Sequence, residues 1–484
     1  MFNPLQKFAL IGLVSLFPLN SVWAQQNSSK ITLPTAISTD NDQSALNLTI
    51  YNQNRALVQE KRKVNILKGQ SNLLYKNVSA QIEAQTLIIK SSGDLQILEQ
   101  NYEYDLITSE KLLDKYVGQQ VTLVQEQGQG LAPKLTPATL ISNNGSPIFE
   151  VDGKILLGMP GKVILPQIPE NMAATPSLKW LTYSANGGAQ NVNISYLTSG
   201  LNWSSDYVLL VDASDKLADL NGWITLNNQS GTGFKNATLK LVAGDVHHYQ
   251  PPMNENYGGA RYKGVAMMMD AAAPEAVQEK TFDEYHLYSV PRPVTVANNQ
   301  TKQIQLLSAS QIKTQKIYKA QPGYFNYFGQ NEEEQKIPVG AFLQFKTGAE
   351  NNLELPLPAG IVRVYKTDSD GSQIFVGEDR INHTPKNEKV SLKTGDAFDI
   401  VCEYKQTKFK RISDRVYETS WSIKVKNHKK EAVEVLFNQA NLYGDWKVTQ
   451  GPKPEQINAQ MAQFKIKAPA DGEQTIEYTI QIKN

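Results

Sequence analysis

The chain has 484 residues, with 48 Lys or Arg, 47 Asp or Glu and a single Cys. This charge balance predicts no basic face for nucleic acid or for an anionic membrane surface. One cysteine excludes an intramolecular disulfide, and the length suggests about three domains.

Residues 1–24 have the features of a secretory signal peptide. Lys7 precedes an apolar stretch over residues 8–17, and Ala24 precedes a cleavage point that falls before Gln25. The apolar stretch of about ten residues is shorter than the roughly 20 that cross a bilayer as a helix. The residue after the cleavage point is not Cys, so a lipid anchor is not expected. We therefore predict a soluble, non-lipidated periplasmic protein.

Alternation of apolar and polar residues recurs along the rest of the chain, most clearly over residues 46–50, 421–426 and 476–483. This period of two predicts half-buried antiparallel strands. Tight-turn residues separate them at 143–145, 186–188, 370–371 and 471–472. We predict an all-β, mainly antiparallel fold of tandem β-sandwich-like domains, with one or two short helices and a long flexible linker.

One segment has helical spacing instead of strand alternation. Ser109 is a candidate N-cap and Gly118 a candidate terminator, with apolar residues on one face between them. Those apolar residues are Leu112, Leu113, Tyr116 and Val117. We predict a helix of about two turns that braces a β layer.

Two breaks in the strand pattern suggest domain boundaries. Pro, Gly, Ala and Met runs predict a flexible linker or long loop at 249–280, and a softer break lies near residue 135. The predicted order is a signal peptide (1–24), an N-terminal β domain (40–135), a central β region (136–248), the linker, and a C-terminal β-sandwich-like domain (281–484).

Several ordered motifs occur at residues 196–203, 206–207, 241–246, 284–288, 357–365 and 395–400. Together they resemble an uncharacterised bacterial domain of unknown function whose relatives include mucoidy inhibitor A-like proteins. The resemblance spans about residues 180–484 and implies an exported β-rich protein without an agreed activity, cofactor or catalytic residue. The labelled relatives contain a long coiled coil, whereas this chain has no sustained heptads.

Residues within these motifs have structural interpretations. Trp203 is expected to fill a core, because Trp buries a large area. Arg363 and Asp399 lie among apolar neighbours and are candidates for a buried ion pair. Pro358 is expected to end one alternating strand, and Gly360 to turn the chain into the next.

The single cysteine, Cys402, is expected to be structural. Period-two geometry places it on the same face as Phe398, Ile400 and Tyr404. A free cysteine on such a face is typically a small buried hydrophobic residue rather than a nucleophile or metal ligand.

Patterns that would support catalysis are absent from the sequence. The five histidines, His247, His248, His286, His383 and His428, show no metal-hydrolase spacing, and no nucleophile elbow or phosphate-binding loop occurs. Residues 368–371 resemble the start of a calcium loop, but the closing Glu does not follow, which favours a hairpin turn. The adjacent acids at 283–284 and 332–334 fit solvated clusters better than glycosidase pairs. We predict no catalytic, cofactor-binding or metal-binding residue.

The leading functional hypothesis is a non-enzymatic periplasmic binding module that presents loops or an edge strand to an envelope protein or polymer. One alternative is an envelope polysaccharide hydrolase whose carboxylates come from separate loops. A second is copper binding by His247, His248, Met253 and residues 267–269, because thioether and imidazole groups suit copper. The partner and the oligomeric state are left open.

Overall fold

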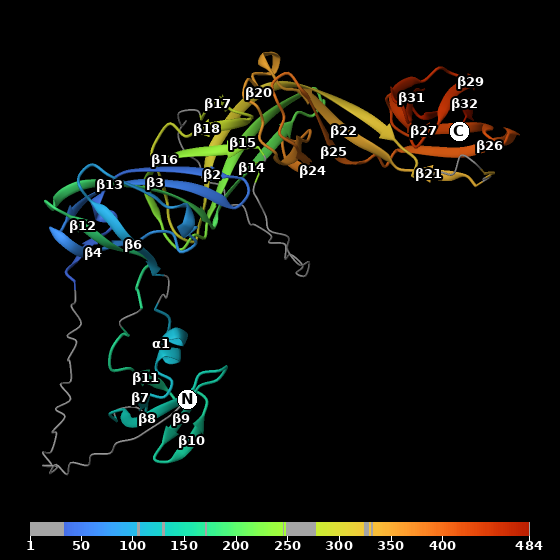
Figure 1. Cartoon of the computed structure of the whole chain (residues 1–484). Helices are drawn as coiled ribbons and strands as arrows, with labels where there is room; N and C mark the ends of the chain where they lie inside the picture. The colour runs from blue at the N-terminus through green and yellow to red at the C-terminus, as the bar shows by residue number, and fades with distance from the viewer. Residues whose placement is uncertain are drawn as a thin grey trace, which may run out of the picture.

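The computed structural model is an all-β protein, as the alternating sequence predicts (Figure 1). It describes residues 33–103, 107–127, 131–169, 172–244, 246–247, 277–323, 329–330 and 333–483. The predicted cleavage point between Ala24 and Gln25 lies outside these ranges. Within them, no helix is both long and apolar enough to span a bilayer.

A four-stranded sheet with the order β1-β4-β12-β6 forms one layer at the N-terminal end. β1 pairs with β4 in parallel, and the other neighbours are antiparallel. The strands are β1 (Thr35–Ser38), β4 (Gly69–Lys76), β12 (Ser177–Ser184) and β6 (Gln96–Glu103).

An eight-stranded sheet packs against this layer, and buried residues of both sheets belong to one hydrophobic core. In order, its main path is β17 (Gln278–Phe282), β18 (Tyr285–Ser289), β16 (Phe234–Ala243), β2 (Gln43–Tyr51), β3 (Arg55–Ile66), β13 (Gly188–Ser199) and β5 (Ile88–Ser91). A short strand, β19 (Val294–Val296), also pairs with β16. The 3-10 helices η1 (Asp40–Asp42) and η2 (Ala84–Thr86) connect these strands.

A small unit is inserted between β6 and β12, which are neighbours in the four-stranded sheet (Figure 1). Its sheet has the order β10-β9-β8-β7-β11. The elements of this insertion are α1 (Ser109–Lys115), β7 (Gln120–Gln125), β8 (Lys134–Ser142), β9 (Ile148–Val151), β10 (Lys154–Leu157) and β11 (Lys162–Ile164). The predicted helix is confirmed, although its N-cap is Thr108, whose hydroxyl accepts the Lys111 N–H at 3.2 Å.

The largest sheet joins the two halves of the molecule. Its main path is β24 (Gln373–Ile381), β23 (Gly360–Thr367), β14 (Leu201–Val211), β15 (Leu217–Asn228), β20 (Gln300–Ala320), β28 (Val433–Gln439), β31 (Met461–Ala468) and β30 (Glu455–Asn458). Two further strands are β22 (Val339–Lys346), paired with β20, and β25 (Lys389–Asp396), paired with β22. β20 has 21 residues, of which 300–313 pair with β15 and 314–320 with β22. The 3-10 helix η3 (Ala349–Asn351) follows β22.

A second core lies at the C-terminal end, between the last part of the largest sheet and a five-stranded sheet (Figure 1). That sheet is ordered β21 (Gln335–Ile337), β26 (Ile400–Ser413), β27 (Val416–Asn427), β32 (Gly472–Lys483) and β29 (Asp445–Gln450). Trp421 and Tyr404 stack at 4.6 Å between ring centroids, and Phe437 from β28 contacts Tyr404 at 5.2 Å. The two sheets therefore form the β-sandwich expected for this end.

The strand pairings redraw the boundary expected near residue 135. That position lies inside β8, which pairs with β7 across the Gly- and Gln-rich connection that suggested a break. β12 pairs with β4, and β13 pairs with β3. Residues 40–135 and 136–248 therefore share sheets and a core instead of forming separate units.

The predicted linker and the start of the last domain also change. Residues 249–276 lie outside the described ranges, but residues 278–280 belong to β17 and pair with β18. The next strands, up to the middle of β20, pack in the first core. The second core first includes Tyr318 at the end of β20, but residues 343–392 return to the first core, so the predicted boundary at residue 281 does not separate the two cores.

The four predicted tight turns lie between β8 and β9, β12 and β13, β23 and β24, and β31 and β32. The first and third close hairpins between paired strands, whereas the second and fourth connect strands of different sheets. Each contains a residue with positive φ: Gly145 (87°), Gly187 (69°), Gly371 (83°) and Asp471 (44°). The strand expected before Pro358 is wrong, because residues 353–357 make only isolated bridges.

Candidate interaction surfaces

The inserted sheet has one buried face and one exposed face. Its buried face packs against Leu113 and Tyr116 of α1. The strand residues on this side are Val121, Leu123, Ala138, Leu140 and Phe149. The Tyr116 hydroxyl donates to the Gln167 carbonyl oxygen at 2.6 Å, which fixes the helix against the segment after β11. The inner face therefore has its own small core.

The outer face of the same sheet is also apolar. Leu135, Ile155, Leu157 and Ile164 are 58, 61, 74 and 51% exposed. Leu157 pairs with Ile148, and Leu135 pairs with Val124, so two of the four lie opposite apolar residues. Ile155 lies opposite Glu150, and Ile164 lies opposite Thr122. We call Leu135, Ile155, Leu157 and Ile164 the outer apolar face.

Such a face is unusual for a sheet that has solvent on one side. An antiparallel sheet normally alternates apolar residues inward with polar residues outward. Here both phases of β10 are apolar, since Ile155 and Leu157 point outward and Leu156 packs toward the inner core. Exposed apolar side chains gathered on one face of a sheet are typical of a site that another protein covers.

The edges of the inserted sheet are less suited to a partner than its face. The edge strands β10 and β11 have only four and three residues. Each begins with an exposed lysine, Lys154 and Lys162. Short strands with lysines resist the addition of a further strand. Docking on this sheet is therefore expected across its face, and not by the edge-strand mode considered from the sequence.

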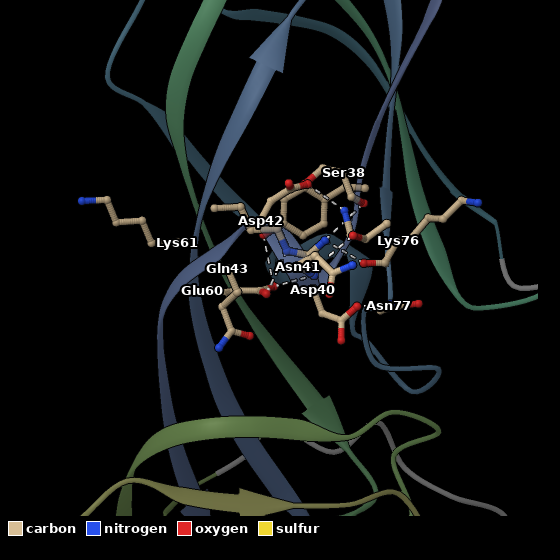
Figure 2. Close-up of polar contacts among 12 residues, drawn as sticks. Ser38, Asp40, Asn41, Asp42, Gln43, Glu60, Lys61, Lys76 and Asn77 are labelled. Carbon is tan, nitrogen blue, oxygen red and sulfur yellow. Dashed lines mark hydrogen bonds and ion pairs between the residues drawn. The ribbon is translucent and has the colours of Figure 1, made fainter.

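A buried ion pair within β3 lies where the two N-terminal sheets meet. Figure 2 shows Glu60 of this pair near Ser38 and Lys76 of the four-stranded sheet. Nε and Nη2 of Arg62 donate to the two carboxylate oxygens of Glu60 at 2.8 and 3.0 Å. Nη1 donates to the carbonyl oxygens of Ser38 and Lys76 at 3.3 and 2.8 Å. β3 is thus connected to the ends of β1 and β4.

Tyr75 completes this cluster from the four-stranded sheet. Its hydroxyl donates to Glu60 Oε2 at 3.1 Å, and the Arg62 guanidinium lies 3.7 Å from its ring centroid. Burial raises the pKa of the Tyr75 hydroxyl, and the negative charge of Glu60 raises it further by a smaller amount. Since Glu60 and Arg62 are almost inaccessible to solvent, the cluster stabilises the contact between the sheets and offers no access to a substrate.

Sequence reasoning did not identify this ion pair, although a signal for it exists. In β3 the buried positions alternate as Ala56, Val58, Glu60, Arg62 and Val64. Residues two apart in a strand lie on the same face. Two opposite charges at such a spacing on the buried face therefore indicate an ion pair inside the core.

The motif residues of the second half converge on the segment before β23. The Tyr207 hydroxyl donates to the Pro358 carbonyl oxygen at 2.8 Å, and the Tyr288 hydroxyl donates to the Pro356 carbonyl oxygen at 2.9 Å. Trp203 lies beside Tyr288, with ring centroids 6.2 Å apart. These contacts fix an irregular segment against the first core, and they explain why the separate motifs form one structural unit.

The comparison with protein families matches residues 192–484 to the family described as Domain of unknown function (DUF4139). The matched range is more than half of the chain. The chain belongs to the DUF4139 family. A search among curated proteins gives no match.

The DUF4139 match begins within β13, a strand that pairs along its whole length with β3. The matched residues therefore share a sheet with strands that precede the match. The tyrosine-bound segment before β23 lies inside the match. The inserted sheet and its outer apolar face lie outside it, so the face is a feature of this chain beyond the matched DUF4139 region.

The structure places Arg363 and Asp399 apart. Arg363 pairs with Asp206 at 3.1 Å and with Glu378 at 3.5 Å, and its side chain is partly exposed. Asp399 is exposed in the turn before β26. The predicted buried pair is therefore wrong, because β23 pairs with β14, which carries Asp206 on the facing strand.

Two other structural interpretations are confirmed. Trp203 is buried, and its Nε1 donates to the Val242 carbonyl oxygen at 3.2 Å. Cys402 is a free, fully buried thiol, and burial raises its pKa to about 12. Phe398, expected on the same face as Cys402, is instead 95% exposed, because the strand begins only at Ile400.

The remaining candidate residues that the structure describes do not assemble into a site. Residues 368–371 form the β23–β24 turn, in which the Gly371 N–H donates to the Asp368 carbonyl oxygen at 3.0 Å. Of the residues considered for copper, only His247 lies within the described ranges. No group of three or more potential metal ligands of the His, Cys, Asp and Glu types occurs in the described part of the chain.

Proposed function

We propose that this chain is an exported binding protein of the cell envelope that docks onto another protein through the outer apolar face and does not itself catalyse a reaction. The observation that carries the proposal is the exposure of Leu135, Ile155, Leu157 and Ile164 on one side of a sheet whose other side is already covered by α1.

Burial of this face would stabilise a complex through the hydrophobic effect. Each Å² of apolar surface removed from water contributes about 25 cal/mol before the costs of association are subtracted. The exposed side chains belong to paired strands, so little backbone conformational entropy is lost when a partner covers them. A rigid apolar face of this type is suited to protein recognition.

Export is part of the same proposal and rests on the sequence of residues 1–24. Removal of this segment would release a periplasmic protein that begins at Gln25. A relation to mucoidy inhibitor A-like proteins would fit an envelope role. Mass spectrometry of the protein recovered from the periplasmic fraction tests both the compartment and the cleavage point.

The binding proposal is tested with a charge substitution on the face. We expect cross-linking in the native envelope, followed by affinity capture, to recover one partner with the wild-type chain. The Ile155→Glu/Leu157→Glu variant should bind the purified partner at least about tenfold more weakly. The two carboxylates would lose their hydration in an apolar contact without gaining a charged partner. Isothermal titration with the purified partner measures the change.

The matched control is Ile374→Glu/Val376→Glu, which places two charges at the same spacing on exposed positions of β24. This control should bind the partner like the wild type. Circular dichroism and thermal unfolding verify that both variants fold. Equal binding by the face variant and the wild type would contradict the proposal.

A further inference from the structure

A polar groove follows β20 where this strand passes from the first core to the second. Its volume is about 1080 Å³. Its lining includes residues 314–319 of β20, residues 213–216, residues 431–434 and Lys465. The groove therefore lies at the junction of the two halves, a position where binding sites commonly occur.

Positive charge predominates along the groove, although the whole chain is nearly neutral. Seven lysines line it, against four acidic residues. The lysines are Lys216, Lys316, Lys319, Lys366, Lys389, Lys429 and Lys465, and the acids are Asp215, Glu431, Glu434 and Glu455. The net charge averaged over the sequence thus conceals a local basic surface.

Internal ion pairs neutralise only part of this charge. Asp215 lies 3.1 Å from the ammonium of Lys316 and 2.8 Å from that of Lys366, so one carboxylate faces two cations. Glu455 pairs with Lys465 at 3.1 Å. In the described ranges, no carboxylate lies within 4 Å of the ammonium of Lys319 or Lys389.

Lys319 and Lys389 are the centre of the uncompensated charge. The Lys319 ammonium lies over the Phe342 ring, 4.7 Å from its centroid, and the side chain is partly buried. Burial lowers the pKa of Lys319, and the like charge of Lys389 lowers it further by a smaller amount. A bound anion would relieve the repulsion between the two ammonium groups.

We propose that this groove binds an acidic polysaccharide, a chain of sugars that carry carboxylates. Separate lysine charges along a groove match carboxylates that are spaced along a polymer. The neutral polar groups of the lining, including Gln315, Gln344 and Ser214, can donate to and accept from sugar hydroxyls. The ligand and its site are thus opposite in charge and alike in polarity.

The lining is less suited to an acidic peptide or to single-stranded nucleic acid. Peptide and protein partners depend on apolar and aromatic anchors that fill pockets, and nucleic-acid bases stack on exposed aromatic rings. The one aromatic residue that lines the groove, Tyr318, is buried and lies under the Lys429 ammonium at 5.4 Å.

This inference names a second ligand and a second surface, and it does not depend on the outer apolar face. The test uses the purified full chain and polygalacturonate of defined length, with dextran of the same length as the neutral comparison. We expect polygalacturonate to bind and dextran not to bind. Affinity should fall as salt rises, because exposed charges are screened over about 8 Å at physiological ionic strength.

The Lys319→Gln/Lys389→Gln variant should bind polygalacturonate about tenfold more weakly than the wild type. Lys408→Gln/Lys410→Gln is the matched control, since it removes two exposed lysines of β26 that do not line the groove. An equal loss in both variants, or equal binding of polyglutamate or an oligonucleotide, would overturn the assignment to a polysaccharide site. A wild-type chain that does not bind polygalacturonate would also overturn this assignment. Each of these outcomes leaves the binding test of the outer apolar face unchanged.

Discussion

Arg62 shows how a single buried side chain connects two sheets. Removing it would leave the Glu60 carboxylate buried without its cation and would free the carbonyl oxygens of Ser38 and Lys76. We expect Arg62→Met to lower the free energy of unfolding by about 3–5 kcal/mol, the usual cost of breaking a buried pair. Urea unfolding monitored by tryptophan fluorescence measures the change.

The same experiment separates charge from packing. Lys63→Met, on the exposed phase of the same strand, should change the free energy of unfolding by less than about 0.5 kcal/mol. Glu60→Leu/Arg62→Met should recover most of the loss, because replacing both partners leaves no unpaired charge in the core. A double variant as unstable as Arg62→Met alone would show that shape, and not charge, dominates this site.

Asp94 is a second residue whose charge contributes to the fold, here at the surface. The Ser184 hydroxyl at 2.5 Å and the Asn186 backbone N–H at 3.0 Å donate to its carboxylate and lower its pKa to about 2. Its unfolded pKa is about 3.9, so its stabilising effect is present above that pH and is lost as the pH falls toward 2.

We therefore expect the wild type to lose more stability than Asp94→Asn between about pH 4 and pH 2, with the two unfolding curves converging at the acid end. Other carboxylates also titrate in this range, but they are common to both proteins. Urea midpoints at several pH values provide the comparison, and a constant difference at every pH would refute this role for Asp94.

At the scale of elements, the approach of β23 to β14 depends on Gly360. The two strands pair in parallel, with Gly360 opposite Ser205. A Cβ at position 360 would lie 2.2 Å from the Ser205 carbonyl oxygen. We expect Gly360→Ala to lower the free energy of unfolding by about 1–3 kcal/mol, because backbone atoms must move apart.

Gly323→Ala is the control for this substitution, since a Cβ there would meet no atom within 4 Å. It should leave the thermal midpoint nearly unchanged, while Gly360→Ala lowers it in a calorimetric scan. If both substitutions have the same small effect, the close approach of β23 to β14 is not limiting.

Local patterns were sufficient to predict most elements of this fold. Period-two alternation predicted strands such as β2, β27 and β32, and turn residues located tight turns between strands. Registers between distant strands could not be predicted, because residues such as Asp206 and Arg363 lie far apart in the chain and meet only through β14 and β23. The outer apolar face was missed for the same reason, since each of its strands reads as an ordinary short apolar run.

At a larger scale, the sheets do not follow the predicted boundaries. Composition located a loop near residue 135. Composition contains no information, however, about which strands pair across that loop. The basic groove was also missed, because charge was counted over the whole sequence, whereas its lysines come from several separate strands and turns. The predicted classes of structure were therefore correct where they depend on neighbours in sequence, and wrong where they depend on topology.

For the whole molecule, β20 is a strand that contributes to two separate cores, as β22 also does. The first part of β20 contributes Ile304, Leu306 and Ile312 to the first core, and its last part contributes Tyr318 and Ala320 to the second. Each core could therefore open without the other, since stability is not uniform across a structure. The junction along β20 is the place where such openings would meet.

Phe437 provides a test of this arrangement, because it is fully buried in the second core and lies outside the first. Phe437→Ala should lower the local free energy of opening by about 3–5 kcal/mol, the usual cost of removing a buried aromatic side chain. Hydrogen exchange followed by mass spectrometry should show faster exchange in peptides from β26, β27 and β32, with β2 and β3 unchanged. Faster exchange in both groups would mean that β20 couples the two cores into one cooperative unit, and the groove along it would then open and close with the whole molecule.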